Sequence, residues 1–258
     1  MKVVIFAGGL GTRISEESHL KPKPMIEIGG RPIIWHIMKI YESFGHNEFI
    51  ICCGYKANII KEYFLNYFLY NSDITVEVQN NKLDVHFTNA ETFKVTLVDT
   101  GIETKTAGRL KKVQKYLNSE TFMLTYGDGV ANINIKELVS FHLQHKKLAT
   151  VSAIQPPGRF GNMKTNKQGE VINFKEKPNH ESAWINAGFF VLEPGIFDYL
   201  PGDEENVMWE ESPMVKLAED GELIAYKHGG FWKCMDAMRD KIELEELWES
   251  NQAKWKIW

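Results

Sequence analysis

The chain has 258 residues, of which 43% are hydrophobic and 25% are charged, and its formal net charge is −4 at pH 7. The length suits one large α/β domain or two small ones, and the hydrophobic content is ample for a buried core. The slightly negative charge, without lysine- or arginine-rich runs, excludes the electrostatic footprint of nucleic-acid binding. No apolar run is long enough to cross a bilayer. We therefore expect a cytoplasmic protein with no signal peptide and neither a membrane nor a nucleic acid as partner.

Apolar runs typical of strands alternate along the chain with apolar residues at helical spacing. Strands are expected at residues 3–6, 49–53, 74–78, 83–87, 95–98, 121–125, 149–154, 171–174, 185–192 and 223–226. Helices are expected at residues 32–44, 56–70, 106–117, 135–145, 208–218 and 238–248. This alternation, with short connections, predicts an α/β fold in which a mostly parallel central sheet is covered by helices on both faces, a three-layer arrangement.

The three cysteines are too few for a disulfide framework, and their spacing fits no common zinc site. Cys52 and Cys53 are adjacent in an apolar run, so they are expected to lie on opposite sides of a strand as small buried hydrophobic residues. Cys234 lies two residues before Asp236. In a strand both side chains would share a face, which raises the hypothesis of a thiolate that binds soft metal ions; an inert buried thiol is the alternative.

A glycine-rich loop directly after the first expected strand is the strongest functional signal. It comprises Phe6, Ala7, Gly8, Gly9, Leu10, Gly11, Thr12 and Arg13, and Lys-Pro-Lys-Pro-Met follows at residues 21–25. Glycines bring the main chain within hydrogen-bonding distance of a ligand, because no Cβ is in the way. Arg13 and Lys23 add two cations, so the loop is typical of phosphate binding and favours a triphosphate that undergoes transfer. An ordinary strand–loop connection would leave both cations unexplained.

Two better-known phosphate loops do not fit this segment. A Walker loop ends in Gly-Lys followed by Ser or Thr, and that sequence does not occur here. A dinucleotide fingerprint needs a third glycine where this chain has Ile14. An NAD-binding enzyme is therefore the weaker alternative.

The loop and the Lys-Pro-Lys-Pro-Met element resemble the sugar-phosphate nucleotidylyltransferases. Further segments resemble the branch of that family that uses CTP, and they extend nearly from end to end of the chain. These segments are Val-Asp-Thr-Gly at 98–101, Gly-Arg-Leu-Lys at 108–111, Thr-Tyr-Gly-Asp-Gly-Val at 125–130, Pro-Gly-Arg-Phe-Gly at 157–161, and residues 231–236.

The resemblance implies a Rossmann-like nucleotidyltransferase fold and the transfer of CMP from CTP to α-D-glucose 1-phosphate, giving CDP-glucose and pyrophosphate. We expect one domain over residues 1–258, with a nucleotide-binding half up to about residue 130 and a sugar-binding half after it. Use of UTP or dTTP remains open, since the sequence does not show how cytosine would be distinguished. The resemblance further implies a homo-oligomer of six subunits and a product used for deoxysugars of surface polysaccharides such as the O-antigen of lipopolysaccharide.

Asp128 and Asp236 are the metal ligands that the resemblance implies, with Mg²⁺ as the cofactor. Asp128 lies between two glycines just past an expected strand, where ligands of such sheets bind, and oxygen ligands suit Mg²⁺. An Asp-Gly turn is the alternative at Asp128, and a helix cap is the alternative at Asp236. In the family's chemistry Arg13, Lys23 and Asp128 would be catalytic, the two cations balancing charge on the phosphates.

The remaining nucleotide contacts implied are Thr104 and Arg109, which flank the connection into an expected helix. Arg109 could instead be a surface arginine. Relatives tend to have two glycines where this chain has Ala107-Gly108, so the shape of the base pocket is open at that point. Arg159 could also reach the site, but no partner is assigned to it.

Lys177, Asn186 and Gly188 are the sugar-phosphate contacts that the resemblance implies. Pro178 favours an extended conformation at Lys177, which would project this side chain; a solvated lysine at a strand end is the alternative. A glycine inside an apolar strand marks either close approach of a ligand or a bulge, and both readings apply to Gly188.

The sequence ends with tryptophans at 255 and 258, after Trp248. Aromatic side chains of this size are unfavourable to expose, so the tail either folds back onto its own subunit or docks on a neighbouring one.

Overall fold

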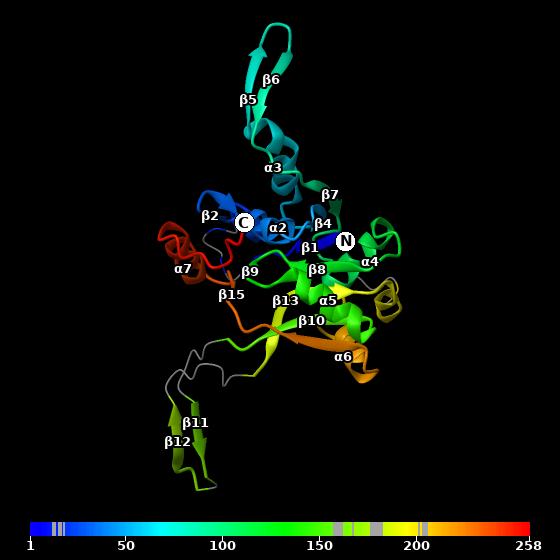
Figure 1. Cartoon of the computed structure of the whole chain (residues 1–258), viewed down its shortest axis with the longest axis vertical. Helices are drawn as coiled ribbons and strands as arrows, with labels where there is room; N and C mark the ends of the chain where they lie inside the picture. Colours follow the sequence, from blue (N-terminus) through cyan, green and yellow to red (C-terminus); the bar gives the residue numbers. More distant parts are fainter. Residues whose placement is uncertain are drawn as a thin grey trace.

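A mixed sheet of seven strands forms the centre of the computed structural model (Figure 1). The structure describes residues 1–11, 14, 17, 19–156, 162–166, 168–175, 183–200, 202 and 206–258. The sheet order is β14 (Leu223–Lys227), β10 (Ala149–Ile154), β13 (Ile185–Leu192), β8 (Phe122–Tyr126), β1 (Val3–Ala7), β4 (Glu48–Cys53) and β7 (Lys94–Asp99). All neighbours pair in parallel except β13, which is antiparallel to both β10 and β8.

The side chains of β1 divide between the two faces of this sheet. Val3, Ile5 and Ala7 join one buried cluster, and Val4 and Phe6 join the other. All five residues of the strand are buried, as expected of a central strand covered on both sides. This division confirms the expected arrangement of helices on both faces of the sheet.

Six α-helices cover the sheet in the described part of the chain. The first cluster receives apolar residues of α2 (Ile33–Glu42), α3 (Ala57–Tyr70), α5 (Ile135–His145) and α7 (Met238–Glu249). The second receives those of α4 (Thr106–Val113) and α6 (Ser212–Glu219). The helix expected at 208–218 begins only at Ser212, and the helix expected at 106–117 continues after Val113 as the 3-10 helix η3 (Gln114–Tyr116).

Several short elements, which the sequence did not predict, build the edge of the sheet that carries the glycine-rich loop. They are β2 (Glu27–Ile28), β3 (Arg31–Pro32), β9 (Gly129–Ala131), β15 (Trp232–Cys234) and the 3-10 helix η2 (Lys23–Met25); another 3-10 helix, η4 (Pro194–Tyr199), follows β13. The strands β9 and β15 pair with each other, so they join the segment after β8 to the segment before α7.

Two hairpins project at opposite ends of the molecule (Figure 1). One is formed by β5 (Ser72–Glu77) and β6 (Lys82–Thr88) beyond α3, and the other by β11 (Asn162–Thr165) and β12 (Val171–Lys175). Nearly every residue of β5 and β6 is exposed. Among the described residues no helix is long and apolar enough to cross a membrane.

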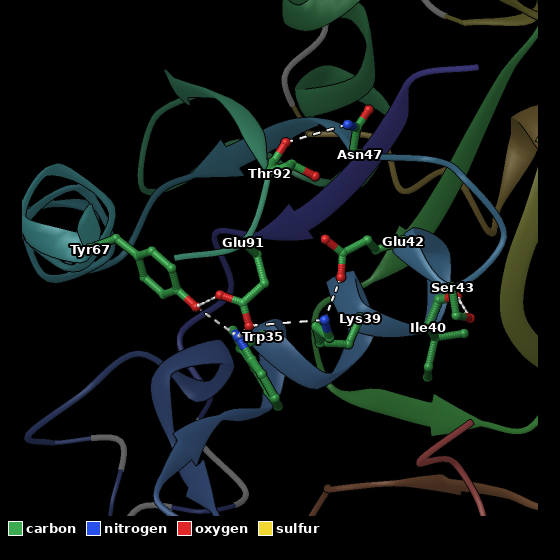
Figure 2. Close-up of polar contacts among 9 residues, drawn as sticks. All are labelled: Trp35, Lys39, Ile40, Glu42, Ser43, Asn47, Tyr67, Glu91 and Thr92. Atoms are coloured by element: carbon green, nitrogen blue, oxygen red, sulfur yellow. Dashed lines mark hydrogen bonds and ion pairs between the residues drawn. The ribbon is translucent and has the colours of Figure 1, made fainter. Parts of the chain in front are cut away.

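A partly buried polar cluster joins the last turn of α3, at Tyr67, to α2 (Figure 2). Trp35 Nε1 donates to Tyr67 Oη at 2.8 Å and to Glu91 Oε1 at 3.0 Å, and Tyr67 Oη donates to Glu91 Oε2. Lys39 Nζ lies 4.0 Å from Glu91 Oε1. Burial, followed by the bond to Glu91, raises the pKa of Tyr67 and keeps its hydroxyl protonated. These hydrogen bonds hold the segments that lead into and out of the first hairpin, at Tyr67 and Glu91, against α2.

The C-terminal tail packs against its own subunit. Trp255 is 1% exposed and its ring stacks on Phe231 at 5.7 Å between centroids. Trp258 makes an edge contact with Trp35 at 5.7 Å. Of the two arrangements that the sequence left open, the structure shows the tail folded back.

Candidate active site

A cavity of about 580 Å³ opens at the carboxyl ends of β1 and β8. This is the edge where ligands of open α/β sheets bind. The residues expected to form the site and found in its lining are Phe6, Ala7, Gly8, Gly9, Leu10, Gly11, Lys23, Thr104, Arg109, Asp128, Asn186 and Asp236. Thr12, Arg13, Arg159 and Lys177 lie outside the described residues. The fold thus brings twelve expected site residues, spread over more than two hundred positions, to one cavity.

Lys23 lies between the two expected metal ligands. Its Nζ is 2.6 Å from Asp128 Oδ2 and 2.7 Å from Asp236 Oδ1, and its side chain is only 14% exposed. Burial alone would lower the pKa of Lys23, but the two carboxylates outweigh burial and raise it, so the ammonium stays charged. The site therefore holds one cation and two anions in direct contact.

Three local structures place these three groups. Lys23 opens η2, and Pro22 before it has a φ of −65°, the value that the proline ring imposes. Asp128 lies in the two-residue connection between β8 and β9, directly before Gly129. The pairing of Cys234 with Gly129 in β15 and β9, together with the bond from Met235 N to Asp128 O at 2.8 Å, brings Asp236 beside Asp128.

Asp240, rather than Asp236, caps helix α7. Its Oδ2 accepts the backbone N–H groups of Asp236 at 3.1 Å and of Ala237 at 2.9 Å. The carboxylate of Asp236 is directed to Lys23 instead. The alternative role of Asp236 as a helix cap is therefore not the role that the structure gives it.

Asp128 and Asp236 suit a magnesium ion by their chemistry. They are two hard oxygen donors that already converge on a single cationic atom, Lys23 Nζ. In the described part of the chain no group of three or more His, Cys, Asp or Glu side chains could hold a metal. Mg²⁺ typically uses one or two carboxylates and completes its shell with substrate phosphates and water, so this small donor set fits it.

Arg109 supports the loops around the cavity. It is 4% exposed, which makes the alternative of a surface arginine wrong. Its Nη1 donates to Cys53 O, Thr100 Oγ1 and Gly101 O at 3.2, 2.6 and 2.8 Å, and its Nη2 donates to Gly8 O and Ile102 O at 3.0 and 3.1 Å. Both terminal amino groups thus bind the protein itself. A Cβ at residue 8 would lie 2.1 Å from Nη1, so a glycine is required there for this support.

The expected sugar contacts Asn186 and Gly188 have different surroundings. Asn186 lines the cavity, whereas Gly188 is not among the lining residues that the structure describes. Gly188 has a φ of +84°, and a Cβ on it would lie 2.5 Å from the Tyr126 ring. The register of β13 against β10 shifts at this point, so the bulge is the reading of Gly188 that the structure bears out.

A carboxylate that sequence reasoning missed lies beside Asn186. Glu210 accepts hydrogen bonds from Tyr126 Oη at 2.6 Å and from Thr106 Oγ1 at 2.7 Å. Asn186 Nδ2 donates to Tyr126 Oη at 2.9 Å. Tyr126 was visible in the segment Thr-Tyr-Gly-Asp-Gly. Glu210 fell within the helix expected at 208–218, whereas the structure places it in the turn before α6, where its carboxylate reaches Tyr126 and Thr106.

Cys52 and Cys53 are buried thiols, and Cys234 is half-buried. Burial raises the pKa of Cys53 to about 11, and Cys52 is also completely buried, as expected. Cys234 lines the cavity with Asp236, and burial, then the charges of Asp236 and Asp128, raises its pKa to about 12. A thiol that stays protonated is a poor metal ligand, so the inert alternative is favoured.

The chain also matches known proteins over its whole length. The family model described as nucleotidyl transferase matches residues 2–236. The chain is 53% identical to the glucose-1-phosphate cytidylyltransferase of Salmonella typhimurium and 45% identical to the probable glucose-1-phosphate cytidylyltransferase of Bacillus subtilis, and each alignment covers 100% of both proteins. The chain belongs to the nucleotidyl transferase family. The resemblance drawn from its motifs is confirmed, and the NAD-binding alternative is discarded.

Solved structures agree with the fold of this nucleotidyl transferase. HddC from Yersinia pseudotuberculosis superposes with a TM-score of 0.70 at 24% identity, covering 96% of this chain and 99% of that one. A UDP-glucose pyrophosphorylase complexed with UDP-glucose superposes with a TM-score of 0.69 at 18% identity, covering 97% and 98%. At these identities the likeness shows the fold alone, and the expected Rossmann-like α/β fold is confirmed.

Proposed function

We propose that this chain transfers CMP from CTP to α-D-glucose 1-phosphate and produces CDP-glucose and pyrophosphate. It is a nucleotidyltransferase, and its 53% and 45% identical relatives are named glucose-1-phosphate cytidylyltransferases. A uridylyltransferase of Synechocystis, by comparison, is only 27% identical over 80% of the chain. The observation that carries the proposal is the Lys23–Asp128–Asp236 cluster beside the glycine-rich loop in one cavity.

The reaction needs positioning and charge neutralisation more than covalent chemistry. An oxygen of the sugar phosphate attacks the α-phosphorus of CTP in line, one P–O bond forms, and the bond to pyrophosphate breaks. The attacking oxygen is already anionic, so no general base is required. The Gly8–Gly11 backbone seats the phosphates and Lys23 supplies a charged ammonium at their position. Arg13 and Lys177 are proposed from the sequence to neutralise the triphosphate and to align the sugar phosphate.

Mg²⁺ is the cofactor that we propose, held by Asp128 and Asp236. When bound it would neutralise negative charge on the phosphate oxygens, and the two carboxylates are the oxygen donors for it in this cavity. Lys23 keeps both carboxylates turned toward one point.

A homo-oligomer, with six subunits as the sequence resemblance implies, and a cytoplasmic location are also proposed. The hairpin of β5 and β6 supports assembly, because Ile74, Val76, Leu83 and Val85 lie on one face of it and are all exposed. The product would serve deoxysugar synthesis for surface polysaccharides.

Isotope labelling tests whether the sugar phosphate attacks the α-phosphorus of CTP and whether pyrophosphate is the group that leaves. Glucose 1-phosphate with ¹⁸O in its phosphate is converted in the presence of unlabelled CTP, and the products are separated and analysed by mass spectrometry. The proposal predicts label in CDP-glucose and none in pyrophosphate, because pyrophosphate comes from the β- and γ-phosphates of CTP. Label in pyrophosphate, or no CDP-glucose, would contradict it.

A further inference from the structure

Glu210 connects the two sides of the cavity through hydroxyl groups. It lies between β13 and α6, in the turn just before α6, whereas Tyr126 ends β8 and Thr106 begins α4. Its Oε1 accepts from Tyr126 Oη at 2.6 Å and its Oε2 accepts from Thr106 Oγ1 at 2.7 Å. Thr106 Oγ1 in turn accepts the N–H of Trp209 at 2.7 Å. Tyr126 and Thr106 both line the cavity.

The carboxylate fixes the direction of these hydrogen bonds. An ionised carboxylate only accepts, so both hydroxyl protons point to Glu210. Tyr126 Oη can then only accept from Asn186, which presents Nδ2 to it at 2.9 Å. At the other end of the amide, Asn186 Oδ1 accepts the N–H of Gly188 at 2.8 Å. Both ends of the amide are therefore assigned.

The tyrosine ring itself has little freedom. It packs against Gly188, where a Cβ would lie 2.5 Å away, and its centroid is 5.9 Å from that of Phe190 and 6.2 Å from that of Phe6. Burial, then the charge and hydrogen bond of Glu210, raises the pKa of Tyr126, so its hydroxyl stays protonated. What remains variable is the direction of the O–H bond, and Glu210 decides it.

We infer that Glu210 is a positioning residue for the sugar part of the cavity: by orienting the Tyr126 hydroxyl it fixes which hydrogen-bonding groups Asn186 presents to a sugar hydroxyl. This inference rests on the proposed function. Beyond the partners that the described residues supply, Asn186 has one more Nδ2–H and one more Oδ1 lone pair for a ligand. Because a sugar hydroxyl can both donate and accept, the orientation of this amide determines which hydroxyl geometry is bound well.

Glu210→Gln is the direct test, with Glu211→Gln as the matched control, since Glu211 is the exposed neighbour. Glutamine keeps the shape of the side chain but can no longer accept from both hydroxyls. The expected result is a rise in the KM for glucose 1-phosphate of roughly tenfold, the size of one misdirected hydrogen bond. The KM for CTP should change by less than the KM for glucose 1-phosphate, and Glu211→Gln should behave as wild type.

Two further measurements separate positioning from mere structural support. The preference for glucose 1-phosphate over its 2-, 3-, 4- and 6-deoxy analogues should shrink for at least one analogue. Tyr126→Phe should also raise the KM for glucose 1-phosphate. In the double variant Glu210→Gln/Tyr126→Phe this KM should be no higher than in the single variant with the higher KM, because both substitutions act through the same hydroxyl group.

The contrary results are equally specific. Glu210→Gln with the same KM for glucose 1-phosphate as Glu211→Gln would overturn the inference, and so would effects that multiply in the double variant. A lowered melting temperature with unchanged sugar selectivity would show a structural role only, which also overturns it. If instead the wild-type protein forms no CDP-glucose from these substrates, the proposed function itself fails, and that outcome is recognised before any variant is compared.

Discussion

Lys23 brings together two carboxylates that would otherwise repel each other. Its Nζ lies within 2.7 Å of both Asp128 and Asp236. Burial opposes the charge, but the attraction to the two carboxylates outweighs burial and raises the pKa of Lys23, so the ammonium stays charged between them. The two carboxylates thus hold positive charge at a single position, between Asp128 and Asp236. A reaction between phosphate groups needs positive charge at such a position to neutralise the phosphate oxygens.

Asp128→Asn and Asp236→Asn should each reduce kcat by roughly a hundredfold or more, because the Mg²⁺ that we propose to be held by these carboxylates would be misplaced, with a loss of several kcal/mol of transition-state stabilisation. The melting temperature should change little, since each variant leaves Lys23 one charged partner. Steady-state kinetics and thermal unfolding measure the two effects. Asp84→Asn, on the exposed hairpin, is the control. If either of these two variants kept full activity, the aspartate that it replaces would not be part of the catalytic site.

Asp240 should contribute stability that depends on pH. Burial alone would raise its pKa, but bonds from backbone N–H groups and from Lys233 outweigh burial and lower it below the ordinary value of 3.8. A lowered folded-state pKa stabilises the protein above the unfolded pKa, and the contribution is lost as the pH falls through the folded value. Asp240→Asn should therefore lose about 1 kcal/mol of unfolding free energy at pH 7.

Urea unfolding of wild type and Asp240→Asn at pH 7 and near pH 3 measures this difference. The gap between the two proteins should shrink at the lower pH. A gap that stays constant would mean that the charge of Asp240 contributes nothing to the cap.

At the scale of elements, the tail after α7 is part of the core that covers α2. Trp255 is 1% exposed, lies 6.3 Å from Trp248 between ring centroids, and stacks on Phe231. His36, at 0% exposure, contacts these rings, and burial lowers its pKa to about 4, so it stays neutral at pH 7. The tail thus stabilises the fold from within the subunit.

Trp255→Ala should lower the unfolding free energy by about 3–5 kcal/mol, the usual effect of removing a large buried aromatic side chain. Denaturant unfolding measures it. Trp184→Ala is the control, because Trp184 is 41% exposed. Equal stability of the two variants would contradict the packing of the tail.

Long elements could be predicted from the sequence, whereas the contacts between them could not. The strands and helices over 135–145, 149–154 and 185–192 have the predicted bounds, because their apolar patterns are long and continuous. The proximity of Asp128 and Asp236 depends on β9 and β15, which have three residues each and leave no pattern. The partners of Arg109 and Glu210 are backbone carbonyls and hydroxyls from distant segments, which spacing along the chain does not reveal.

At the scale of the whole molecule, the hairpin of β5 and β6 projects from the body and is exposed along almost its whole length. Ile74 pairs with Val85 and Val76 with Leu83, so four exposed apolar side chains share one face. Such a face on a projecting arm is typical of an interaction surface. The hairpin is therefore the place where the proposed homo-oligomer should be sensitive to substitution.

The double variant Val76→Lys/Val85→Lys should reduce the mass in solution, because charged side chains oppose burial of this face in an interface. Light scattering measures the mass. Thr75→Lys, which lies on the other face of β5, is the control. An oligomer of unchanged mass would show that assembly does not use this face.

The transfer of CMP from CTP to glucose 1-phosphate can be tested by comparing nucleoside triphosphates and sugar 1-phosphates in a single assay. Pyrophosphate release is followed with CTP, UTP, dTTP, ATP and GTP, each crossed with glucose, galactose and mannose 1-phosphates. CTP with glucose 1-phosphate should have the highest kcat/KM of all combinations. A higher value with UTP or dTTP, or with another sugar 1-phosphate, would contradict it.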